Sequence, residues 1–561
     1  MADFPWLKSY PKGIAHTIDA DKYPSLIAIL EESFQKYANL PAYVFMDKVL
    51  TYKEIDKKSR DFAAYLQSIG LKQGDKVGLQ MPNVLQYPIA LFGALRAGMI
   101  VVNVNPQYTV REMEHQYKDG EVKATVIIAN FASNLEVALP KTDIKHVIVT
   151  EVGDMLGFIK GNIVNYVVKH KKKMVPAFNI PGAVGFNKAL SIGAASTFTK
   201  PEIKSSDLAF LQYTGGTTGV SKGAMLTHRN MVANMLMIRE WTNPRLKEGI
   251  ETVITPLPLY HVFALTVNCF TMFSLGAKNV LIANPRDMVA FLGEMIKYKF
   301  TVLTGLNTLF IGMMNHKDFA KVDFTGVRTV VAGGMAMQKA VAEKWKAMTG
   351  IAVAEGYGLS ETAPVLTVNP IDGTDQVGTI GVPVSSVEIK LLDEDENEVA
   401  MGEPGEIAAK GPNVMLGYWK RQDETDKVFT KDGFFKTGDV GIMAEDGFFK
   451  IVDRKKDMVL VSGFNVYPNE IEDVVASHPK VLEVAAIGVP DKNAGERVRI
   501  YVIKKDESLT ERELSDYCKD NLAGYKQPRD VLFRTELPKS NVGKILRKIL
   551  KDEAKAEAAV V

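Results

Sequence analysis

Residues 213–224 read YTGGTTGVSKGA and bring together the donor groups that a polyphosphate needs. Glycines let the backbone turn tightly and direct its amides at an anion, hydroxyl groups add donors, and Lys222 adds a cation on a long stem. A Walker A loop requires Ser or Thr directly after the lysine, whereas Lys222 is followed by Gly223. A ligand-free hairpin rich in glycine and threonine is the alternative. If the segment binds nucleotide, the residues expected to contact it are Tyr213, Thr214, Gly215, Gly216, Thr217, Thr218, Gly219, Val220, Ser221, Lys222, Gly223 and Ala224.

Three later strings also carry groups that could do chemistry. Residues 356–362 read GYGLSET and put a hydroxyl beside a carboxylate, the type of oxygen ligand that Mg²⁺ prefers. Residues 432–439 read DGFFKTGD, with a carboxylate at a glycine turn. Residues 537–547 read LPKSNVGKILR, with a lysine after a glycine near the end of the chain. Taken singly, each string also fits a plain turn or a solvated surface charge.

The elements that must position these strings alternate in type. Short β-branched runs predict strands, and amphipathic stretches between them predict helices, an alternation that favours mostly parallel sheets packed under helices. From about Ile380 to Trp419 turn signals crowd together, which indicates a small antiparallel β region, and a compact module of helices and strands follows. The expected strands are 75–81, 124–129, 146–150, 207–214, 251–256, 278–283, 300–306 and 328–333, and the expected helices include 51–70 and 85–97.

Composition bounds the class of protein. A chain of 561 residues is too long for one hydrophobic core, so two or more domains are expected. Basic residues number 68 against 66 acidic ones, a balance that disfavours nucleic-acid binding. Two cysteines, Cys269 and Cys518, cannot build a disulfide scaffold or a four-thiolate metal site, which favours a reducing compartment. No signal peptide is expected at the start, and no uninterrupted apolar run predicts a spanning helix.

The arrangement of residues 213–224 resembles the phosphate-binding signature of the adenylate-forming enzymes, which include acyl-CoA synthetases, luciferases and peptide-synthetase adenylation domains. Many members carry Ser or Thr where this chain has Gly216. Residues 432–456 resemble the fatty-acyl-CoA synthetase signature, with Phe434 in place of the usual tryptophan. The resemblance covers about residues 23–547 and is greatest to bacterial long-chain fatty acid–CoA ligases, in the strings LPLYHVFALT, DRKKDMVLVSGFNVYPNEIEDVV and LPKSNVGKILRK.

The resemblance implies an α/β fold with two domains. A large N-terminal domain, residues 1–455, would combine mixed or parallel sheets, helices and the small antiparallel β region, and would hold the acyl and ATP sites. A small mobile α+β domain, residues 456–561, would carry the catalytic lysine and the loop on the CoA side. Lys456 would be the hinge between them, since a hinge is a few residues that absorb a large dihedral change. A plain charged linker is the alternative for that position.

The resemblance also implies the substrates and the role of each candidate residue. ATP, Mg²⁺ and coenzyme A would bind together with a fatty acid. Tyr357 would stack on adenine, Asp439 would accept from the ribose hydroxyls and Arg454 would support them. The strand end at Gly333 and Gly334, with Gly356, would let adenine approach the backbone, although Met335-Ala336 departs from the usual Ala-Pro. The catalytic residues would be Lys544, Glu361, Ser360 and His261, the metal ligands Thr214 and Glu361, and the CoA-binding residues Ser462, Gly463 and Phe464.

Lys544 has a physical role in this interpretation. The reaction brings a carboxylate up to a triphosphate, and a cation between the two anions offsets their repulsion in the transition state. His261, within PLPLYHVFAL, would lie near the acyl carboxylate or gate the acyl tunnel, and a satisfied core histidine is the alternative. The C-terminal domain would then rotate about Lys456, remove Lys544 and present residues 462–468 for thioester formation.

Residues 157–178 interrupt the alternation. An apolar stripe of Ile163, Tyr166 and Val167 is followed by lysines 169, 171, 172 and 173 around His170. Such a stretch can bind an anionic membrane face, with roughly 1 kcal/mol per cation, or it can be a solvated surface helix. By the resemblance the protein would be cytoplasmic, would associate peripherally with the inner face of the cytoplasmic membrane, and could be a homodimer.

Rival functions remain open at this level. The same fold could serve a medium-chain or aryl-CoA ligase, an acyl-AMP ligase that loads a carrier protein, or a luciferase-like oxygenase. A non-catalytic, membrane-docked lipid-binding module is a different class, and it would bind fatty acid without releasing pyrophosphate. The sequence does not fix the acyl chain length, because tunnel depth is a three-dimensional property.

Overall fold

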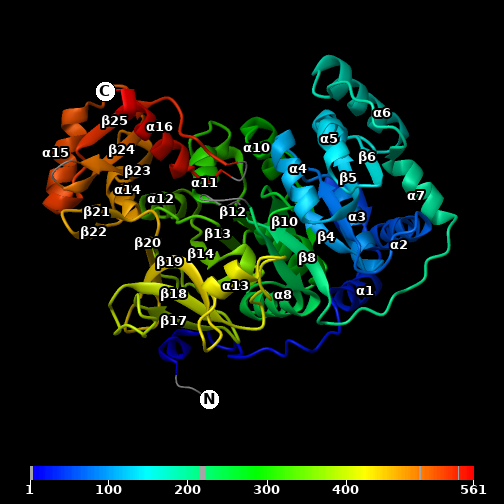
Figure 1. Ribbon diagram of the computed structural model, residues 1–561, viewed down its shortest axis with the longest axis horizontal. Helices are drawn as coiled ribbons and strands as arrows, with labels where there is room; N and C mark the ends of the chain where they lie inside the picture. Colours follow the sequence, from blue (N-terminus) through cyan, green and yellow to red (C-terminus); the bar gives the residue numbers. More distant parts are fainter. Residues whose placement is uncertain (1–3, 215–220, 492–493, 541–542, 561) are drawn as a thin grey trace.

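A computed structural model describes residues 4–214, 221–491, 494–540 and 543–560 of the chain. It has a large N-terminal α/β domain with two mixed sheets and a smaller antiparallel sheet, and a small C-terminal domain with a sheet of its own (Figure 1). The predicted fold class is confirmed. The predicted division between residues 455 and 456 stays a prediction.

Both large sheets are mainly parallel in their centres and antiparallel at an edge. The nine-stranded sheet has the order β16 (Val382–Pro383), β15 (Val365–Val368), β14 (Val353–Gly358), β13 (Thr329–Gly333), β12 (Val302–Gly305), β10 (Thr252–Thr255), β11 (Lys278–Leu281), β1 (Pro41–Phe45) and β2 (Lys48–Thr51). The seven-stranded sheet has the order β7 (Val184–Gly185), β6 (His146–Thr150), β5 (Val122–Ile128), β3 (Lys76–Gln80), β4 (Ile100–Asn103), β8 (Leu208–Tyr213) and β9 (Gly223–Thr227). Each predicted strand therefore exists, with ends at most two residues from the expected ones.

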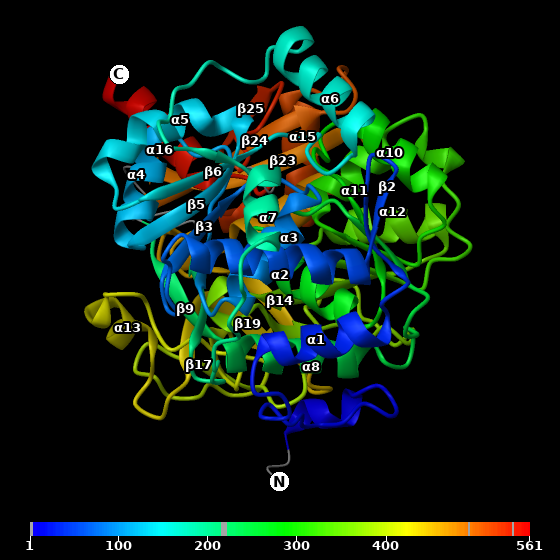
Figure 2. The same ribbon diagram turned by 90° about the vertical axis from the view of Figure 1, so that its right-hand side faces the viewer.

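Helices cover these sheets, and α2 lies along α3 at one face of the molecule (Figure 2). α2 begins where Thr51 and Glu54 form a reciprocal capping box, which satisfies orphan backbone amides of the first turn. The helices of the large domain, apart from the short α9, are α1 (Leu26–Lys36), α2 (Tyr52–Ser68), α3 (Gln86–Arg96), α4 (Val110–Asp119), α5 (Ala132–Ala138), α6 (Phe158–Tyr166), α7 (Phe186–Ala194), α8 (His228–Thr242), α10 (Met288–Lys297), α11 (Asn307–Met314), α12 (Lys339–Thr349) and α13 (Gln422–Val428).

The helix α3 is buried along its whole length. Its one guanidinium, that of Arg96, is buried against Asp56 and lies 4.7 Å from the ring of Phe34, so the charge has partners inside the fold. No helix among the described residues has both the length and the apolar character needed to cross a membrane.

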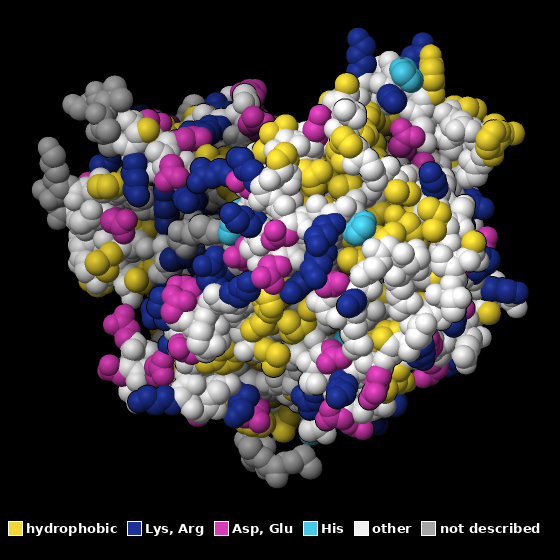
Figure 3. Space-filling model, turned by 45° about the vertical axis from the view of Figure 1, so that its right-hand side comes forward, with side chains coloured by type: hydrophobic (Ala, Val, Ile, Leu, Met, Phe, Trp, Pro, Cys, Tyr) yellow, Lys and Arg dark blue, Asp and Glu magenta, His cyan; other side chains and the backbone are white. Residues whose placement is uncertain are grey.

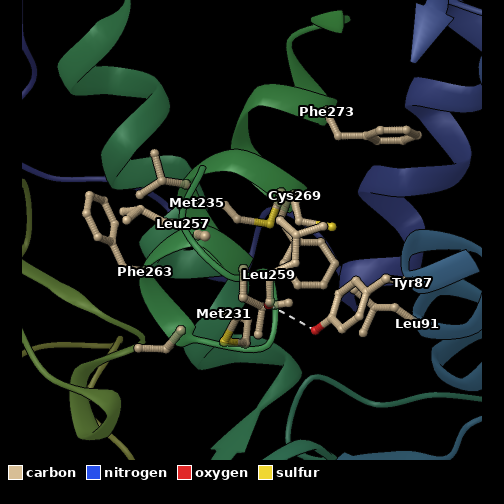
Figure 4. Close-up of a cluster of buried hydrophobic side chains, with 14 of the residues drawn as sticks. Tyr87, Leu91, Met231, Met235, Leu257, Leu259, Phe263, Cys269 and Phe273 are labelled. Carbon is tan, nitrogen blue, oxygen red and sulfur yellow. Dashed lines mark hydrogen bonds between the residues drawn. The ribbon is translucent and has the colours of Figure 1, made fainter. Parts of the chain in front are cut away.

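The core between α3 and α8 fixes the segment that leads to His261. Met231 and Met235 of α8 belong to the same buried cluster as Tyr87 of α3, and the Tyr87 hydroxyl donates to the Leu259 carbonyl at 2.9 Å (Figure 4). The Asn83 side chain donates to Leu257 O at 2.9 Å and accepts from Leu259 N at 2.8 Å. These bonds tie an irregular loop to the sheet layer. The helical turn α9 (Val262–Ala264) and the π-helix η5 (Leu265–Met272) follow it.

The antiparallel region is larger than the sequence suggested. Its four strands are β17 (Glu388–Leu392), β18 (Gly405–Lys410), β19 (Phe435–Met443) and β20 (Phe449–Arg454), paired in that order. The expected end near Trp419 is therefore wrong. The string used as a chemical signature, residues 432–456, is also a β-hairpin, whose turn contains Gly447 at a φ of 84°.

The C-terminal domain has separate hydrophobic clusters around its sheet. The strands β22 (Phe464–Val466), β21 (Val459–Val461), β24 (Gly495–Lys504) and β23 (Val481–Asp491) are antiparallel, and β25 (Asp530–Arg534) joins β24 in parallel. Its helices are α14 (Pro468–Ala476), α15 (Glu511–Asn521) and α16 (Arg547–Val560). Leu550 and Ala554 of α16 are buried, so this last helix packs against the domain.

Candidate active site

A cavity of about 600 Å³ lies where the parallel strands β12, β13 and β14 end and where the two domains meet. Ligands of open α/β sheets bind outside the carboxyl ends of the strands, so this is the expected place. Polar residues line one end of it and apolar residues the other. The polar lining includes Thr214, Lys222, His261, Tyr357, Ser360, Glu361, Thr437, Asp439, Arg454, Lys455, Lys456 and Lys544.

Tyr357, Asp439 and Arg454 meet although they come from three strands. The Tyr357 hydroxyl donates to Asp439 Oδ2 at 2.7 Å, and Arg454 Nε lies 3.3 Å from Asp439 Oδ1. Asp439 and Arg454 are register partners in β19 and β20, which explains their proximity. Burial and the Asp439 charge raise the pKa of Tyr357 well above its usual value, so its hydroxyl stays protonated. A hydrogen bond and an ion pair thus join the three residues predicted at the nucleoside.

Backbone forms the neighbouring wall of the cavity. Gly333 at the end of β13 pairs in register with Gly356 of β14. A Cβ atom on Gly333 would lie 3.1 Å from the Gly356 carbonyl oxygen and 3.2 Å from the ring of Phe263. Gly334 has a φ of 81°, a region that L side chains rarely adopt. Glycine is therefore the residue that fits this wall.

Glu361 is buried at the end of the GYGLSET string, next to half-buried Ser360. The Tyr418 hydroxyl donates to Glu361 Oε1 at 2.7 Å. Burial raises the pKa of Glu361, and the Tyr418 hydrogen bond partly opposes that rise. Lys222 lies 4.5 Å from the Tyr418 ring and pairs with Glu424 Oε2 at 2.8 Å. Tyr418 and Glu424 were missed in the sequence analysis. No motif marks them, and only the folded structure brings them to Glu361 and Lys222.

The oxygen donors around Glu361 can be compared with those that Mg²⁺ needs. Among the described residues no group of three or more His, Cys, Asp or Glu side chains could hold a metal. Mg²⁺ at nucleotide sites takes one or two carboxylates and completes its shell with phosphate oxygens and water. A single buried carboxylate beside Thr214 and Lys222 fits that pattern.

The predicted phosphate loop is described only at its two stems. Tyr213 and Gly223 are register partners in β8 and β9, and Thr214 N donates to Lys222 O at 3.0 Å. The Tyr213 hydroxyl donates to Asp119 Oδ2 at 2.6 Å, and Tyr213, Ser221, Gly223 and Ala224 do not line the cavity. Thr214 and Lys222 do. Predicted residues that lie outside the described residues are Gly215, Gly216, Thr217, Thr218, Gly219 and Val220.

Lys544 reaches into the cavity from the C-terminal domain. Its turn is closed by Ser540 N donating to Lys544 O at 2.7 Å. The turn also rests on the large domain, because the Thr308 hydroxyl donates to Gly543 O at 3.2 Å and Arg286 donates to Ser540 O at 3.3 Å. Lys544 Cε lies 3.7 Å from the position of a Cβ on Gly334. The candidate cation therefore meets the glycine wall.

The charge on Lys544 is sensitive to its surroundings. Burial, and secondarily the Arg454 cation, lower its pKa to about 8, while Asp439 and Glu361 oppose that fall. Burial and the nearby Lys544 lower the pKa of His261 to about 3, so its imidazole is neutral. His261 Nδ1 accepts from Phe263 N at 3.4 Å and caps α9. His261 thus lines the cavity and also satisfies a backbone amide, and its role at the acyl carboxylate stays a prediction.

Residues predicted on the CoA side lie away from the cavity. Ser462, Gly463 and Phe464 form the β21–β22 hairpin and are absent from the cavity lining. The Phe464 ring is exposed and stacks on Tyr525 at 4.8 Å between centroids. Lys456 does line the cavity, and burial lowers its pKa.

The apolar end of the cavity was almost entirely missed. Of the apolar neighbours of His261 in the string PLPLYHVFAL, Val262 and Phe263 line it. The other apolar lining residues include Ile238, Trp241, Leu246, Val267, Met272, Val302, Val331, Ala332, Pro364, Val365, Val368, Ile371 and Val384. They come from helices, strands and loops spread along the chain and share no motif.

Comparison with known proteins agrees with this geometry. Residues 30–419 match the AMP-binding enzyme family, and residues 470–544 match the AMP-binding enzyme C-terminal domain. A long-chain-fatty-acid–CoA ligase of Escherichia coli O6:H1 is 55% identical over 98% of both chains, and one of Bacillus subtilis is 38% identical over 98% of both. The crystal structure of an anthranilate CoA ligase with anthranoyl-AMP superposes with a TM-score of 0.86 at 25% identity, over 97% of this chain and all of that one. The chain belongs to the AMP-binding, adenylate-forming enzymes.

Proposed function

We propose that the protein is a long-chain fatty acid–CoA ligase that forms an acyl-adenylate from ATP and a fatty acid and passes the acyl group to CoA. The supporting observation is one cavity with two ends. Lys544, Asp439, Tyr357 and Glu361 crowd the polar end, and an apolar end large enough for an alkyl chain continues from it. Relatives named for this activity at 50–55% identity support the choice of acid.

In the first half-reaction the fatty carboxylate attacks the α-phosphorus of ATP and pyrophosphate leaves. Lys544 lies beside the glycine wall and would offset the repulsion between the two anions. Asp439, oriented by Tyr357 and Arg454, would accept hydrogen bonds from the ribose hydroxyls. Mg²⁺ bound at Glu361, with Thr214 as a second ligand, would neutralise phosphate charge. Neutral His261 can orient the carboxylate without competing as a cation.

In the second half-reaction the CoA thiolate attacks the adenylate carbonyl and AMP leaves. Ser462, Gly463 and Phe464 now lie outside the cavity, and Lys544 occupies it. A rotation of the C-terminal domain about Lys456 would withdraw Lys544 and bring residues 462–464 to the cavity. The Lys544 turn contacts the large domain through hydrogen bonds from Thr308 and Arg286, which such a rotation would break. One site would then serve two transition states.

The decisive experiment is ATP–pyrophosphate exchange with saturated acids from C6 to C18, and with coumarate as the aryl rival. CoA or a carrier protein is added afterwards, and thioester and AMP are measured. The proposal expects exchange with fatty acids, then acyl-CoA and AMP in equal amounts. Exchange with coumarate alone, or transfer only to a carrier, would support a rival, and fatty-acid binding without pyrophosphate release would support a lipid-binding module.

The helix α6 and the π-helical turn after it (Val167–Lys171) support contact with an anionic membrane surface. Phe158 and Ile159 are 87% and 74% exposed, and Ile163 and Tyr166 are more than half exposed. This segment projects from the body, and lysines and hydrophobic side chains gather at its tip (Figure 3). The exposed lysines that follow α6 are Lys169, Lys171, Lys172 and Lys173. Apolar rings beside a cationic cluster match an acyl boundary beneath anionic headgroups.

Sedimentation with phosphatidylglycerol vesicles tests this surface. Replacing Lys171, Lys172 and Lys173 by Gln should weaken binding by about 3 kcal/mol at low salt, since each cation contributes roughly 1 kcal/mol. The control variant replaces Lys57, Lys321 and Lys519, which are also exposed, by Gln. Equal loss in both variants would mean that only net charge matters. A homodimer stays a prediction.

A further inference from the structure

The apolar end of the cavity has a floor. Leu246, Met272 and Val302 line the cavity and belong to one small buried cluster, with Val253, Leu275 and Ala277 behind them. Leu246 follows α8, where Ile238, Trp241 and Thr242 line the cavity at helical spacing. Leu246 is the member of this floor that comes from a loop, residues 243–251, rather than from a strand or helix.

The depth to that floor follows from strand geometry. Gly333, Val331 and Thr329 line the cavity from β13, with Gly333 at the Lys544 end and Thr329 level with Val302 of β12. Four residues of strand span about 13 Å. Four residues contain twelve backbone bonds, and an extended alkyl chain advances similarly per bond, so this depth matches about twelve carbons.

Side chains outside the cavity hold the loop that carries Leu246. Glu251 is buried, and its Oε1 accepts from Arg328 Nη1 at 3.0 Å and from Lys247 N at 2.7 Å. Within the described part of the chain, Glu251 Oε2 is buried without a hydrogen-bond partner. Arg245 Nε donates to the Ile371 carbonyl at 2.6 Å, and Ile371 also lines the cavity. The backbone of the loop adds bonds from Leu246 N to Thr242 O at 2.9 Å, from Gly249 N to Leu275 O at 2.8 Å and from Lys278 N to Glu251 O at 2.9 Å. Arg239 of α8 also pairs with Glu248 at 2.7 Å.

We infer that Leu246 sets the acyl chain length and that residues 243–251 form a gate that acids longer than about twelve carbons must displace. This rests on the proposed function, and it names the part of the site that selects the acid. In the present conformation a C8 or C10 acid ends above Leu246. A C16 acid reaches past it and moves the loop against the Arg245 and Glu251 bonds. Selectivity is then a balance between methylene burial and the cost of opening those bonds.

The test is ATP–pyrophosphate exchange with C8 and C16 acids in opposite variants. Leu246→Trp fills the floor and should lower kcat/KM for C16 by at least about tenfold while sparing C8, because several methylenes lose burial. Leu246→Ala should raise the C16-to-C8 ratio, and so should Arg245→Ala, which releases the loop. Ile250→Trp is the matched control, since Ile250 is in the same loop and 56% exposed, and its ratio should equal that of the parent.

Each outcome decides. If Leu246→Trp lowers C8 and C16 equally while its thermal unfolding is unchanged, or if Leu246→Ala leaves the ratio unchanged, the floor is not Leu246. If Leu246→Trp fails to fold, the Leu246→Ala and Arg245→Ala ratios decide alone. If none of the fatty acids supports pyrophosphate exchange by the parent protein, the proposed function fails, and this inference fails with it. That outcome differs from an unchanged C16-to-C8 ratio in an active enzyme, which overturns this inference alone.

Discussion

The two ends of the cavity are held together by different forces. At the nucleotide end, Asp439 bonds to Tyr357 and pairs with Arg454, and Tyr418 bonds to Glu361, so polar atoms are fixed by other polar atoms. At the acyl end, packing of apolar side chains shapes most of the walls, and a few side-chain bonds outside the cavity hold Trp241 and the loop at the floor. The nucleotide end should therefore fail when one atom changes. The acyl end should tolerate substitution and change its preference.

The largest effect is expected outside the cavity, at Arg547, three residues after Lys544. Its guanidinium donates to both oxygens of Glu472 at 3.1 and 2.7 Å and lies 3.3 Å from buried Asp453 on the strand before Lys456. Burial by itself lowers the pKa of Arg547, but Glu472 and Asp453 more than reverse this and raise it. Arg547→Met leaves the buried Asp453 and the partly buried Glu472 without this counter-charge, which should cost about 3–5 kcal/mol in the free energy of unfolding of the C-terminal domain. Urea denaturation measures it, and a loss below 1 kcal/mol would mean that solvent reaches the cluster.

The next effect concerns the ribose contact. Asp439→Asn keeps the shape but removes the charge that Tyr357 and Arg454 orient. Charge-assisted hydrogen bonds contribute about 1.5–3 kcal/mol, so KM for ATP should rise about 10- to 100-fold. The C16-to-C8 ratio should stay as in the parent, because that ratio belongs to the other end. A change in the ratio without a change in KM for ATP would contradict the separation of the two ends.

The third prediction is a pH dependence. Lys544 must be protonated to act as a cation, and its pKa is about 8. In the adenylation half-reaction kcat/KM for ATP should therefore be level below pH 8 and fall about tenfold per pH unit above it. Lys544→Arg should act more slowly but without this fall, since guanidinium stays charged. A fall in both proteins would assign the titration to another group.

Stability should change with pH in the opposite direction. The usual lysine pKa is 10.5, so between pH 8 and 10.5 the unfolded chain binds more protons than the folded one. The contribution of Lys544 to the free energy of unfolding then rises with pH while activity falls. Comparison of the parent with Lys544→Met by urea denaturation at pH 7 and pH 10 isolates this contribution.

The smallest effect is expected at Trp241, on the acyl wall. Its indole Nε1 donates to the Asn369 carbonyl at 3.2 Å. Trp241→Phe removes one neutral hydrogen bond and some volume, which should cost about 1 kcal/mol of stability. KM for ATP should not change, whereas the preferred acid should become longer or bulkier. A raised KM for ATP would show that the two ends are coupled through the wall.

The same contrast explains what the sequence could predict. Each strand that was predicted from the strand–helix alternation is present in the structure. The strings that contain Lys544, Glu361 and Asp439 could be recognised because polar chemistry needs particular atoms in a short stretch. Tyr418 and Glu424 were missed because their partners, Glu361 and Lys222, are far away in sequence. Leu246 was missed because any apolar residue of suitable volume could fill the floor. The preferred length of the acyl chain could not be predicted, because it depends on how β13, α8 and the loop after α8 are placed relative to one another.

The central claim is that Lys544, delivered by the C-terminal domain, offsets the repulsion between carboxylate and triphosphate. The most direct measurement compares the two half-reactions of Lys544→Ala, pyrophosphate exchange with a C8 acid and thioester formation from supplied acyl-adenylate and CoA. We predict that exchange falls on the order of 10²–10³-fold while thioester formation keeps its rate. An equal fall in both half-reactions, or no fall in exchange, would contradict the account.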